Sequence, residues 1–185
     1  MVKYCDLVVY MTAQLADDSN TTASGTLSQR FSADTINNLG IIHKICRIYR
    51  KDPDDREDLF QEILYNAWRS YASFEGRSKF STWLYRVALN TAFHQTRKDK
   101  FFGKLTELDK IEHYPAPEPE EDKSHALWWA IGKLDELEKS IVLLYLDELS
   151  YKEISEITGL TENNVGVKLN RIKIKMKKLL EQYGA

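Results

Sequence analysis

The prolines at every second position from Pro115 to Pro119 limit what this chain can fold into more than any other feature. Each proline lacks a backbone N–H and fixes its φ angle, so this run cannot be helical and holds the backbone extended. The surrounding stretch, residues 107–122, holds seven acidic residues and one lysine. We interpret residues 103–123 as a flexible acidic linker, which divides the chain into two domains.

On both sides of this linker, apolar residues recur with the period of a helix. Glycine is scarce, with 8 in 185 residues, and hydrophobic residues make up 43%, which suits packed helical cores. Asp52 followed by Pro53 is typical of a helix start. We therefore predict an all-α fold of two small helical bundles. The predicted divisions are a flexible N-terminal tail over 1–30, a first bundle over 31–102, the linker over 103–123 and a second bundle over 124–185.

The second bundle contains the pattern of a helix-turn-helix. Ser150 and Glu153 have the spacing of a capping box, in which each side chain accepts a hydrogen bond from the other's backbone N–H. Gly159 suits the left-handed position that closes the short helix. Thr161 then caps a second helix, whose inner face carries Val165, Leu169, Ile172 and Met176. A short helix, a glycine turn and a second helix make a DNA-binding arrangement.

The outer face of this second helix is predicted to contact DNA. Asparagine pairs with adenine, and arginine or lysine pairs with guanine or phosphate. Between Val165 and Lys178 there are six basic residues and no acid, although a lysine-rich helix end can also be a merely solvated surface. Gly166 is unusual inside a helix, and one hypothesis is close approach of its backbone to DNA. The candidate residues are Thr161, Asn163, Asn164, Gly166, Val167, Lys168, Asn170 and Arg171.

Other functions are excluded by what the sequence lacks. His43 and Cys46 lie three residues apart, but no second pair of ligands accompanies them, so we predict no metal and no cofactor. No nucleophile–base set, paired carboxylate motif or phosphate loop appears, so we predict that the protein is not an enzyme. No apolar run approaches about 18 residues, which predicts a cytoplasmic protein without membrane insertion.

The stretch from residue 54 to residue 97 carries a specific resemblance. It contains EDLFQE over residues 57–62 and FEGRSKFSTWLYRVALN over residues 74–90. Both resemble the promoter-melting domain of the extracytoplasmic-function sigma factors. The second domain of that family ends in a helix-turn-helix similar to LSYKEISEITGLTENNVGVKLNRIK, at residues 149–173. Two motifs in the family's order, with a linker between them, make this resemblance specific.

The resemblance implies three partners: core RNA polymerase, promoter DNA and an anti-sigma factor. It implies that the −35 element is bound by the helix-turn-helix. It implies that core polymerase is bound by Asp58, Leu59, Gln61 and Glu62. Without the resemblance, this helix face would be interpreted as merely solvated. It also implies that the −10 element is bound with one base flipped out of the stack. The residues implied in this binding are Phe74, Gly76, Arg77, Ser78, Lys79, Phe80, Arg86 and Asn90. Trp83 lies on an apolar stripe, which favours a place in the core over stacking on a base.

Residues 164–172 depart from the family pattern, in which T-V-K-S-R-L-x-R-A is usual, so the −35 sequence cannot be copied from relatives. Two alternatives stay open. One is an ordinary helix-turn-helix regulator that binds duplex DNA without polymerase, which leaves the loop over residues 74–80 without a task. The other is a decoy for an anti-sigma factor, against which the basic recognition helix argues.

Overall fold

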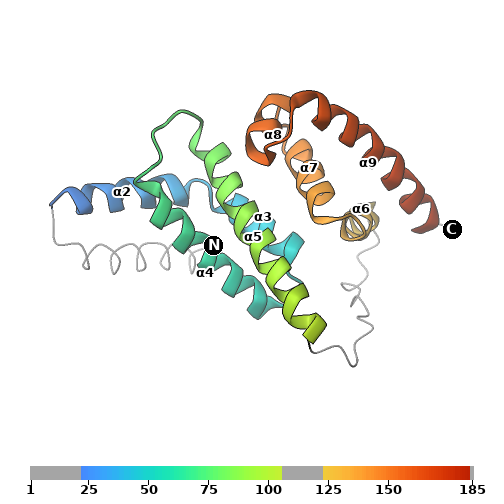
Figure 1. Ribbon diagram of the computed structural model, residues 1–185, viewed down its shortest axis with the longest axis horizontal. Coiled ribbons are helices and arrows are strands. Elements are labelled where there is room, and N and C mark those ends of the chain that lie inside the picture. Colours follow the sequence, from blue (N-terminus) through green and yellow to red (C-terminus); the bar gives the residue numbers. More distant parts are fainter. Residues whose placement is uncertain (1–21, 106–122, 184–185) are drawn as a thin grey trace. The chain divides into compact units, whose positions relative to one another are not determined.

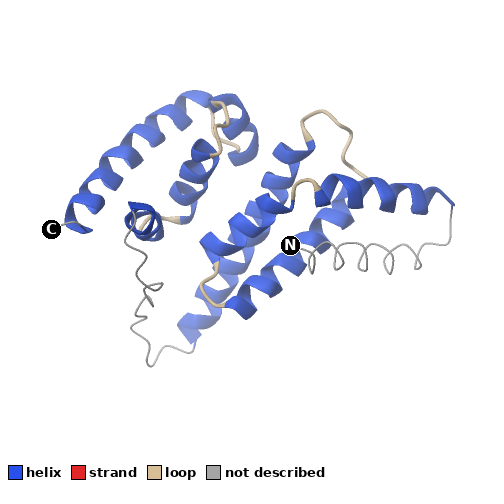
Figure 2. Cartoon of the chain, turned by 180° about the vertical axis from the view of Figure 1, so that it is seen from behind, coloured by secondary structure: helices blue, strands red, loops and turns tan. Residues whose placement is uncertain are grey.

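The computed structural model describes residues 22–105 and 123–183, and every regular element in these ranges is a helix (Figures 1 and 2). This confirms the predicted all-α class. The first 21 residues and most of the predicted linker lie outside the described residues. The chain forms two compact units, Met1–Gln95 and Thr96–Ala185. The helices are α2 (Thr22–Ile36), α3 (Leu39–Tyr49), α4 (Pro53–Tyr71), α5 (Phe80–Leu105), α6 (Lys123–Gly132), α7 (Glu136–Leu146), α8 (Tyr151–Thr158) and α9 (Glu162–Tyr183).

Helix α4 supplies much of the core of the first unit. It begins as the sequence predicts, because Asp52 Oδ1 accepts a hydrogen bond of 2.8 Å from the backbone N–H of Asp54, with Pro53 at the first helical position. Helices α4 and α5 lie side by side, and Asn66 Nδ2 donates to Thr91 Oγ1 over 3.2 Å (Figure 1). The apolar stripe of α4 is buried at Leu59, Phe60, Ile63, Leu64, Ala67 and Tyr71.

Helix α2 begins at Thr22, inside the segment that the sequence predicted to be a tail up to residue 30. Phe31 is 1% exposed, and its ring meets those of Trp68 and Tyr71 with centroids 5.3 and 5.1 Å apart. The Tyr71 hydroxyl donates to Asp34 Oδ2 over 2.7 Å. The serines, threonines and glycine of α2 favour helix weakly, so tertiary packing through Phe31 is what stabilises this helix. Residues 22–30 are therefore helical and do not belong to a tail.

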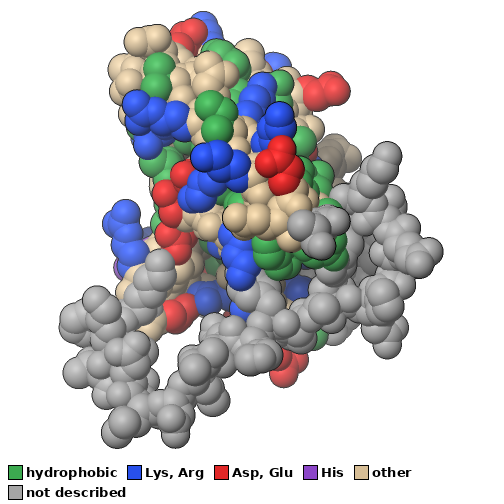
Figure 3. Space-filling model, turned by 90° about the vertical axis from the view of Figure 1, so that its right-hand side faces the viewer, with side chains coloured by type: hydrophobic (Ala, Val, Ile, Leu, Met, Phe, Trp, Pro, Cys, Tyr) green, Lys and Arg blue, Asp and Glu red, His purple; other side chains and the backbone are tan. Residues whose placement is uncertain are grey.

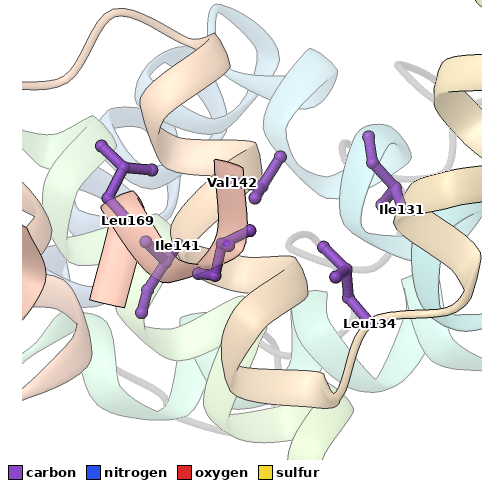
Figure 4. Packing of buried hydrophobic residues seen from close by; sticks show 6 residues of the cluster. Ile131, Leu134, Ile141, Val142 and Leu169 are labelled. Carbon is purple, nitrogen blue, oxygen red and sulfur yellow. The ribbon is translucent and has the colours of Figure 1, made fainter. Parts of the chain in front are cut away.

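The second unit packs α6, α7 and α8 against α9. Its buried cluster joins residues of α6, α7 and α9, as the close-up of Ile131, Ile141 and Leu169 shows (Figure 4). Burying a leucine or isoleucine side chain in this way stabilises the fold by about 1.5–3 kcal/mol. The cluster consists of Ile131, Leu134, Ile141, Val142, Leu169 and Ile172. Within the described ranges, no helix is long and apolar enough to cross a membrane.

The turn from α7 into α8 fixes where the helix-turn-helix starts. Glu148 has φ of +59°, a left-handed conformation at which glycine is usual. Its N–H donates to the carbonyl of Tyr145 over 3.0 Å, and the N–H of Leu149 donates to the carbonyl of Leu144 over 3.1 Å. These two bonds form a Schellman motif, which satisfies the last carbonyls of α7 and turns the chain toward α8.

Candidate nucleic-acid interface

The helix-turn-helix has the capping geometry that the sequence predicts. The Ser150 hydroxyl accepts from the Glu153 N–H over 3.3 Å, while Glu153 Oε2 accepts from the Ser150 N–H over 3.0 Å. Gly159 ends α8 with φ of +75°. Thr161 Oγ1 then accepts from the Asn164 N–H over 3.3 Å at the start of α9. These contacts confirm the predicted start and end of α8 and the predicted start of α9.

Replacing Ser150 by alanine tests this capping box. Because the backbone N–H of Glu153 loses its acceptor, the Ser150 hydroxyl, we expect S150A to lower the free energy of unfolding by about 1 kcal/mol. Urea denaturation of the full chain, followed by circular dichroism, measures the change. Ser155→Ala in the middle of α8 is the matched control, since it removes a hydroxyl that caps nothing. An equal loss in both variants would contradict the role of the cap.

The structure brings the predicted −35 residues together on the N-terminal half of α9 and its cap. Val165, Leu169 and Ile172 are buried against the rest of the unit, which turns the opposite side of α9 outward. Among the candidates, Gly166 and Lys168 are half-buried, and Thr161, Asn163, Asn164, Val167, Asn170 and Arg171 are exposed. An accessible recognition helix of this kind has the shape and polarity to enter a major groove.

Two of the six basic residues of α9 also contact α7. Lys173 Nζ donates to the Tyr145 hydroxyl over 3.0 Å and lies 4.3 Å from the centre of its ring, and this hydrogen bond raises the pKa of Lys173. Lys175 Nζ lies 2.6 Å from Glu138 Oε2. Lys and Arg side chains gather among apolar ones on the upper part of the face shown in Figure 3. The basic surface of α9 is thus partly engaged within its own unit.

Glu138 also belongs to a capping box that the sequence reasoning missed. Its carboxylate accepts from the Asp135 N–H over 3.1 Å, and Asp135 Oδ1 accepts from the Glu138 N–H over 2.7 Å. The D-x-x-E spacing before an apolar run was the signal that could have found it. One carboxylate therefore caps α7 and contacts α9, which ties the start of one helix to the side of the other.

The loop from Phe74 to Phe80 is held at both ends by aromatic packing. The ring of Trp83 lies 5.2 Å from Phe74 and 5.3 Å from Phe80, measured between centroids. Tyr71 contacts all three rings at about 6 Å. This packing favours a structural place for Trp83. It also means that the two phenylalanines, predicted to contact DNA, serve first to anchor the loop.

The middle of this loop is its accessible part. Gly76 has φ of +69°, a conformation that side-chain-bearing residues adopt rarely. Arg77 is exposed and forms an ion pair with Glu75. Ser78 is half-buried, and Lys79 is exposed. The loop therefore presents two basic side chains around a tight turn.

On the following helix, α5, Arg86 and Asn90 lie one turn apart, and both are exposed. Their neighbours Tyr85, Ala88 and Leu89 are buried. Residues four apart share one side of a helix. The structure therefore places these two predicted −10 residues on one exposed side of α5.

The predicted core-binding residues of α4 separate into two kinds. Asp58 and Gln61 are exposed, whereas Leu59 is fully buried and packs in the core of the first unit, so it has no accessible surface for a partner. Glu62 is half-buried and accepts a hydrogen bond from Gln95 Nε2, and Gln95 Oε1 accepts one from Arg50. The interhelical contact gives Glu62 a structural task as well.

Tyr65 was missed by the sequence reasoning. Its side chain is 47% exposed, and it follows Gln61 by one turn and Asp58 by two turns of α4. The signal was an aromatic residue on an otherwise polar face, at the i+4 and i+7 spacing of one helix side. Tyrosine is enriched at the energetic centres of protein interfaces.

His43 and Cys46 take part in packing. The His43 ring stacks on Phe60 with centroids 4.8 Å apart, and burial lowers its pKa. Cys46 is buried, and burial raises the pKa of its thiol to about 12. A thiol with so high a pKa stays protonated at neutral pH and is a poor nucleophile and a poor metal ligand.

Two protein families match the chain, one N-terminal and one C-terminal to the predicted linker. The family described as Sigma-70 region 2 matches residues 37–102. The family described as Sigma-70, region 4 matches residues 124–176. Together they cover well over half of the chain, and they occur in the order of the two helical bundles.

Similar proteins of known name and structure agree with this. The RNA polymerase sigma factor YlaC of Bacillus subtilis is 34% identical over 131 residues, which cover 66% of this chain and 75% of that protein. The ECF RNA polymerase sigma factor SigW of the same organism is 30% identical over 154 residues, covering 75% of this chain and 82% of SigW. The sigma factor RpoE of Bartonella quintana, solved in complex with the anti-sigma factor NepR, has a similar fold. The two structures superpose with a TM-score of 0.68 at 21% sequence identity, and the superposed part covers 83% of this chain and 98% of RpoE.

Proposed function

Because the chain belongs to the sigma-70 family and is a sigma factor that directs promoter-specific transcription initiation, we propose that its two units divide this task. The first unit binds core RNA polymerase and captures the −10 element, while the second binds the −35 element. The protein then acts in the cytoplasm as a polymerase subunit without catalysis of its own. The exposed outer face of α9, on a capped helix-turn-helix, carries the DNA-binding half of this proposal.

Capture of the −10 element is assigned to the loop over residues 74–80 and to the stripe of Arg86 and Asn90. Flipping one base out of a duplex costs a few kcal/mol, which stacking and hydrogen bonds must offset. Arg77, Lys79 and Arg86 are exposed and basic, which suits a backbone of phosphates. The aromatic packing of Phe74 and Phe80 keeps the loop in place before DNA arrives, so less conformational freedom is lost on binding.

Core binding is assigned to the exposed face of α4 with Asp58, Gln61 and Tyr65. This face combines a negative charge and an amide with an aromatic ring, a mixture suited to a polar interface with an aromatic anchor. Leu59 is buried in the core of the first unit and is not part of this face. Complementary charge on the polymerase would steer association.

Regulation by an anti-sigma factor is also proposed. RpoE of Bartonella quintana and CnrH were both solved in complexes, the first with the anti-sigma factor NepR and the second with the cytosolic domain of CnrY. CnrH resembles this chain with a TM-score of 0.59 at 19% identity, over 94% of this chain. Affinity purification of the tagged full chain, with mass spectrometry of what is retained, tests this part of the proposal.

Transcription in a purified system tests the function directly. The full chain is mixed with core polymerase from its own organism and with genomic DNA, and the 5′ ends of the transcripts are sequenced. We expect initiation at a limited set of sites that share −10 and −35 elements. Core alone is the control. Initiation at no site, or tight duplex binding by the chain without core, would contradict the sigma role.

Reversing the charge of Asp58 tests the core-binding face. We expect D58K to weaken the complex with core about tenfold, or about 1.4 kcal/mol, because like charges then face each other. The dissociation constant is measured without DNA, by fluorescence anisotropy of the labelled chain. Glu156→Lys on the exposed side of α8 is the matched control, since it changes net charge equally. A similar loss in both variants would show a non-specific charge effect.

A further inference from the structure

The glycine inside the recognition helix lies beneath the ring of Tyr151. A Cβ atom placed on Gly166 would lie 3.4 Å from Tyr151 Cε2 and 3.8 Å from Cδ2. Alanine would therefore fit in ordinary contact, but any longer side chain would have to displace the ring. Tyr151 itself is 42% exposed at the first position of α8. The ring thus occupies the place that a side chain at position 166 would take on the flank of α9.

Val167 lies at the centre of the outward side of α9. It comes two residues after the fully buried Val165 and two before the buried Leu169, which places it about 160–200° around the helix from both. Its side chain is 44% exposed. Polar candidates flank it on the same side, with Asn163 and Asn170 one turn away on either side. An aliphatic side chain is therefore central on a surface that otherwise offers amides and cations.

The chemistry of the major groove explains how such a surface discriminates. Amides and cations recognise the hydrogen-bonding edges of the bases, but the C5-methyl group of thymine offers none and is recognised through apolar contact. A valine at the centre of the helix face can pack against this methyl group and exclude water from it. A cytosine at the same place lacks the C5-methyl group, so this apolar contact would be lost.

We propose that Val167 recognises a thymine methyl group in the −35 element, and that Tyr151, whose ring lies over the neighbouring Gly166, extends this apolar surface. This proposal rests on the proposed −35 binding and specifies what one part of that site selects. It assigns Tyr151, which lies outside the recognition helix, to the recognition surface. The Tyr151 ring lies at ordinary contact distance from a Cβ atom placed on Gly166, so the ring covers this part of α9.

Replacing thymine by uracil removes the methyl group and leaves the hydrogen-bonding edge unchanged. The test uses holoenzyme reconstituted from the full chain and core, on a promoter found by transcript sequencing. Each thymine of the −35 region, on either strand, is replaced singly by deoxyuridine, and the affinity is measured by competition. We expect one position at which uracil weakens binding about fourfold, the effect of burying one carbon group.

Variants then connect the methyl effect to the residues. In V167A the penalty for uracil at that position is expected to fall below about twofold, because the larger apolar contact is gone. Ile174→Ala, which also removes an exposed apolar side chain from α9, is the matched control and should keep the fourfold penalty. Tyr151→Ala should reduce the penalty, while Tyr151→Phe keeps the ring and should preserve it.

The outcomes separate this inference from the function beneath it. Equal affinity for thymine and uracil at every position, with normal promoter selection, would overturn the inference and leave the sigma role intact. An unchanged uracil penalty in V167A, or its loss in I174A, would also overturn it. Failure of the wild-type holoenzyme to select any promoter would overturn the sigma role, and the inference with it.

Discussion

Phe31→Ala is expected to lower the free energy of unfolding of the first unit by about 3–5 kcal/mol. Phe31 is fully buried, and its ring meets Trp68 and Tyr71 edge to face, so alanine leaves a cavity between α2 and α4. Loss of this anchor also deprives α2 of the contact that offsets its weak helix propensity. Urea denaturation followed by tryptophan fluorescence measures the effect, since Trp68 lies against the replaced ring.

Tyr65→Ala is the matched control for this experiment. Tyr65 also carries a large aromatic side chain and lies in the same unit, but 47% of it is exposed. We expect its replacement to change the free energy of unfolding by no more than about 0.5 kcal/mol. A Phe31→Ala variant as stable as the wild type would show that α2 contributes nothing to the fold of the first unit.

Arg171→Ala is expected to weaken binding of the holoenzyme to its promoter about 5- to 150-fold, which corresponds to about 1–3 kcal/mol. Arg171 is exposed on the outer side of α9, and its fork of donors suits the O6 and N7 atoms of guanine. The loss should be concentrated at one base pair, so that the variant no longer distinguishes guanine there from other bases. Competition binding with −35 variants measures this selectivity.

Lys177→Ala is the comparison for Arg171→Ala. Lys177 is exposed farther along α9, where its Nζ lies 4.0 Å from Glu181 Oε1. Loss of a lysine that contacts phosphate weakens binding to all sequences alike. It also lowers the slope of the logarithm of affinity against the logarithm of salt concentration by about one. If Arg171→Ala weakened every promoter sequence equally, Arg171 would be a phosphate contact and would carry no sequence information.

Local signals in the sequence were sufficient wherever a few neighbouring residues determine the structure. Asp52 with Pro53, the Ser150–Glu153 pair, Gly159 and Thr161 each satisfy backbone groups within one helical turn, so their spacing alone predicted the helix ends. The residues of the candidate −35 surface followed from the same logic, because the buried positions of α9 fix which side faces outward.

Contacts between distant parts of the chain could not be predicted in this way. The first half of α2, residues 22–30, was missed because the stability of this helix depends on Phe31 meeting Trp68 and Tyr71, which lie 37 or more residues further along the sequence. The same holds for Tyr151 over Gly166 and for Lys175 with Glu138. Leu59 was assigned to a partner because it stands within a surface motif, although its helical position turns it inward.

Lys173 and Lys175 of α9, which contact Tyr145 and Glu138 of α7, affect how polymerase finds its promoters. A lysine that stays with Tyr145 or Glu138 displaces fewer counterions from duplex DNA, so random sequences are held less tightly. A chromosome offers about 10⁶–10⁹ competing sites, and time spent at each of them delays arrival at the correct one. With a net charge of −2 for the whole chain, we expect the holoenzyme's search to be made of short visits, with long residence only where bases as well as phosphates match.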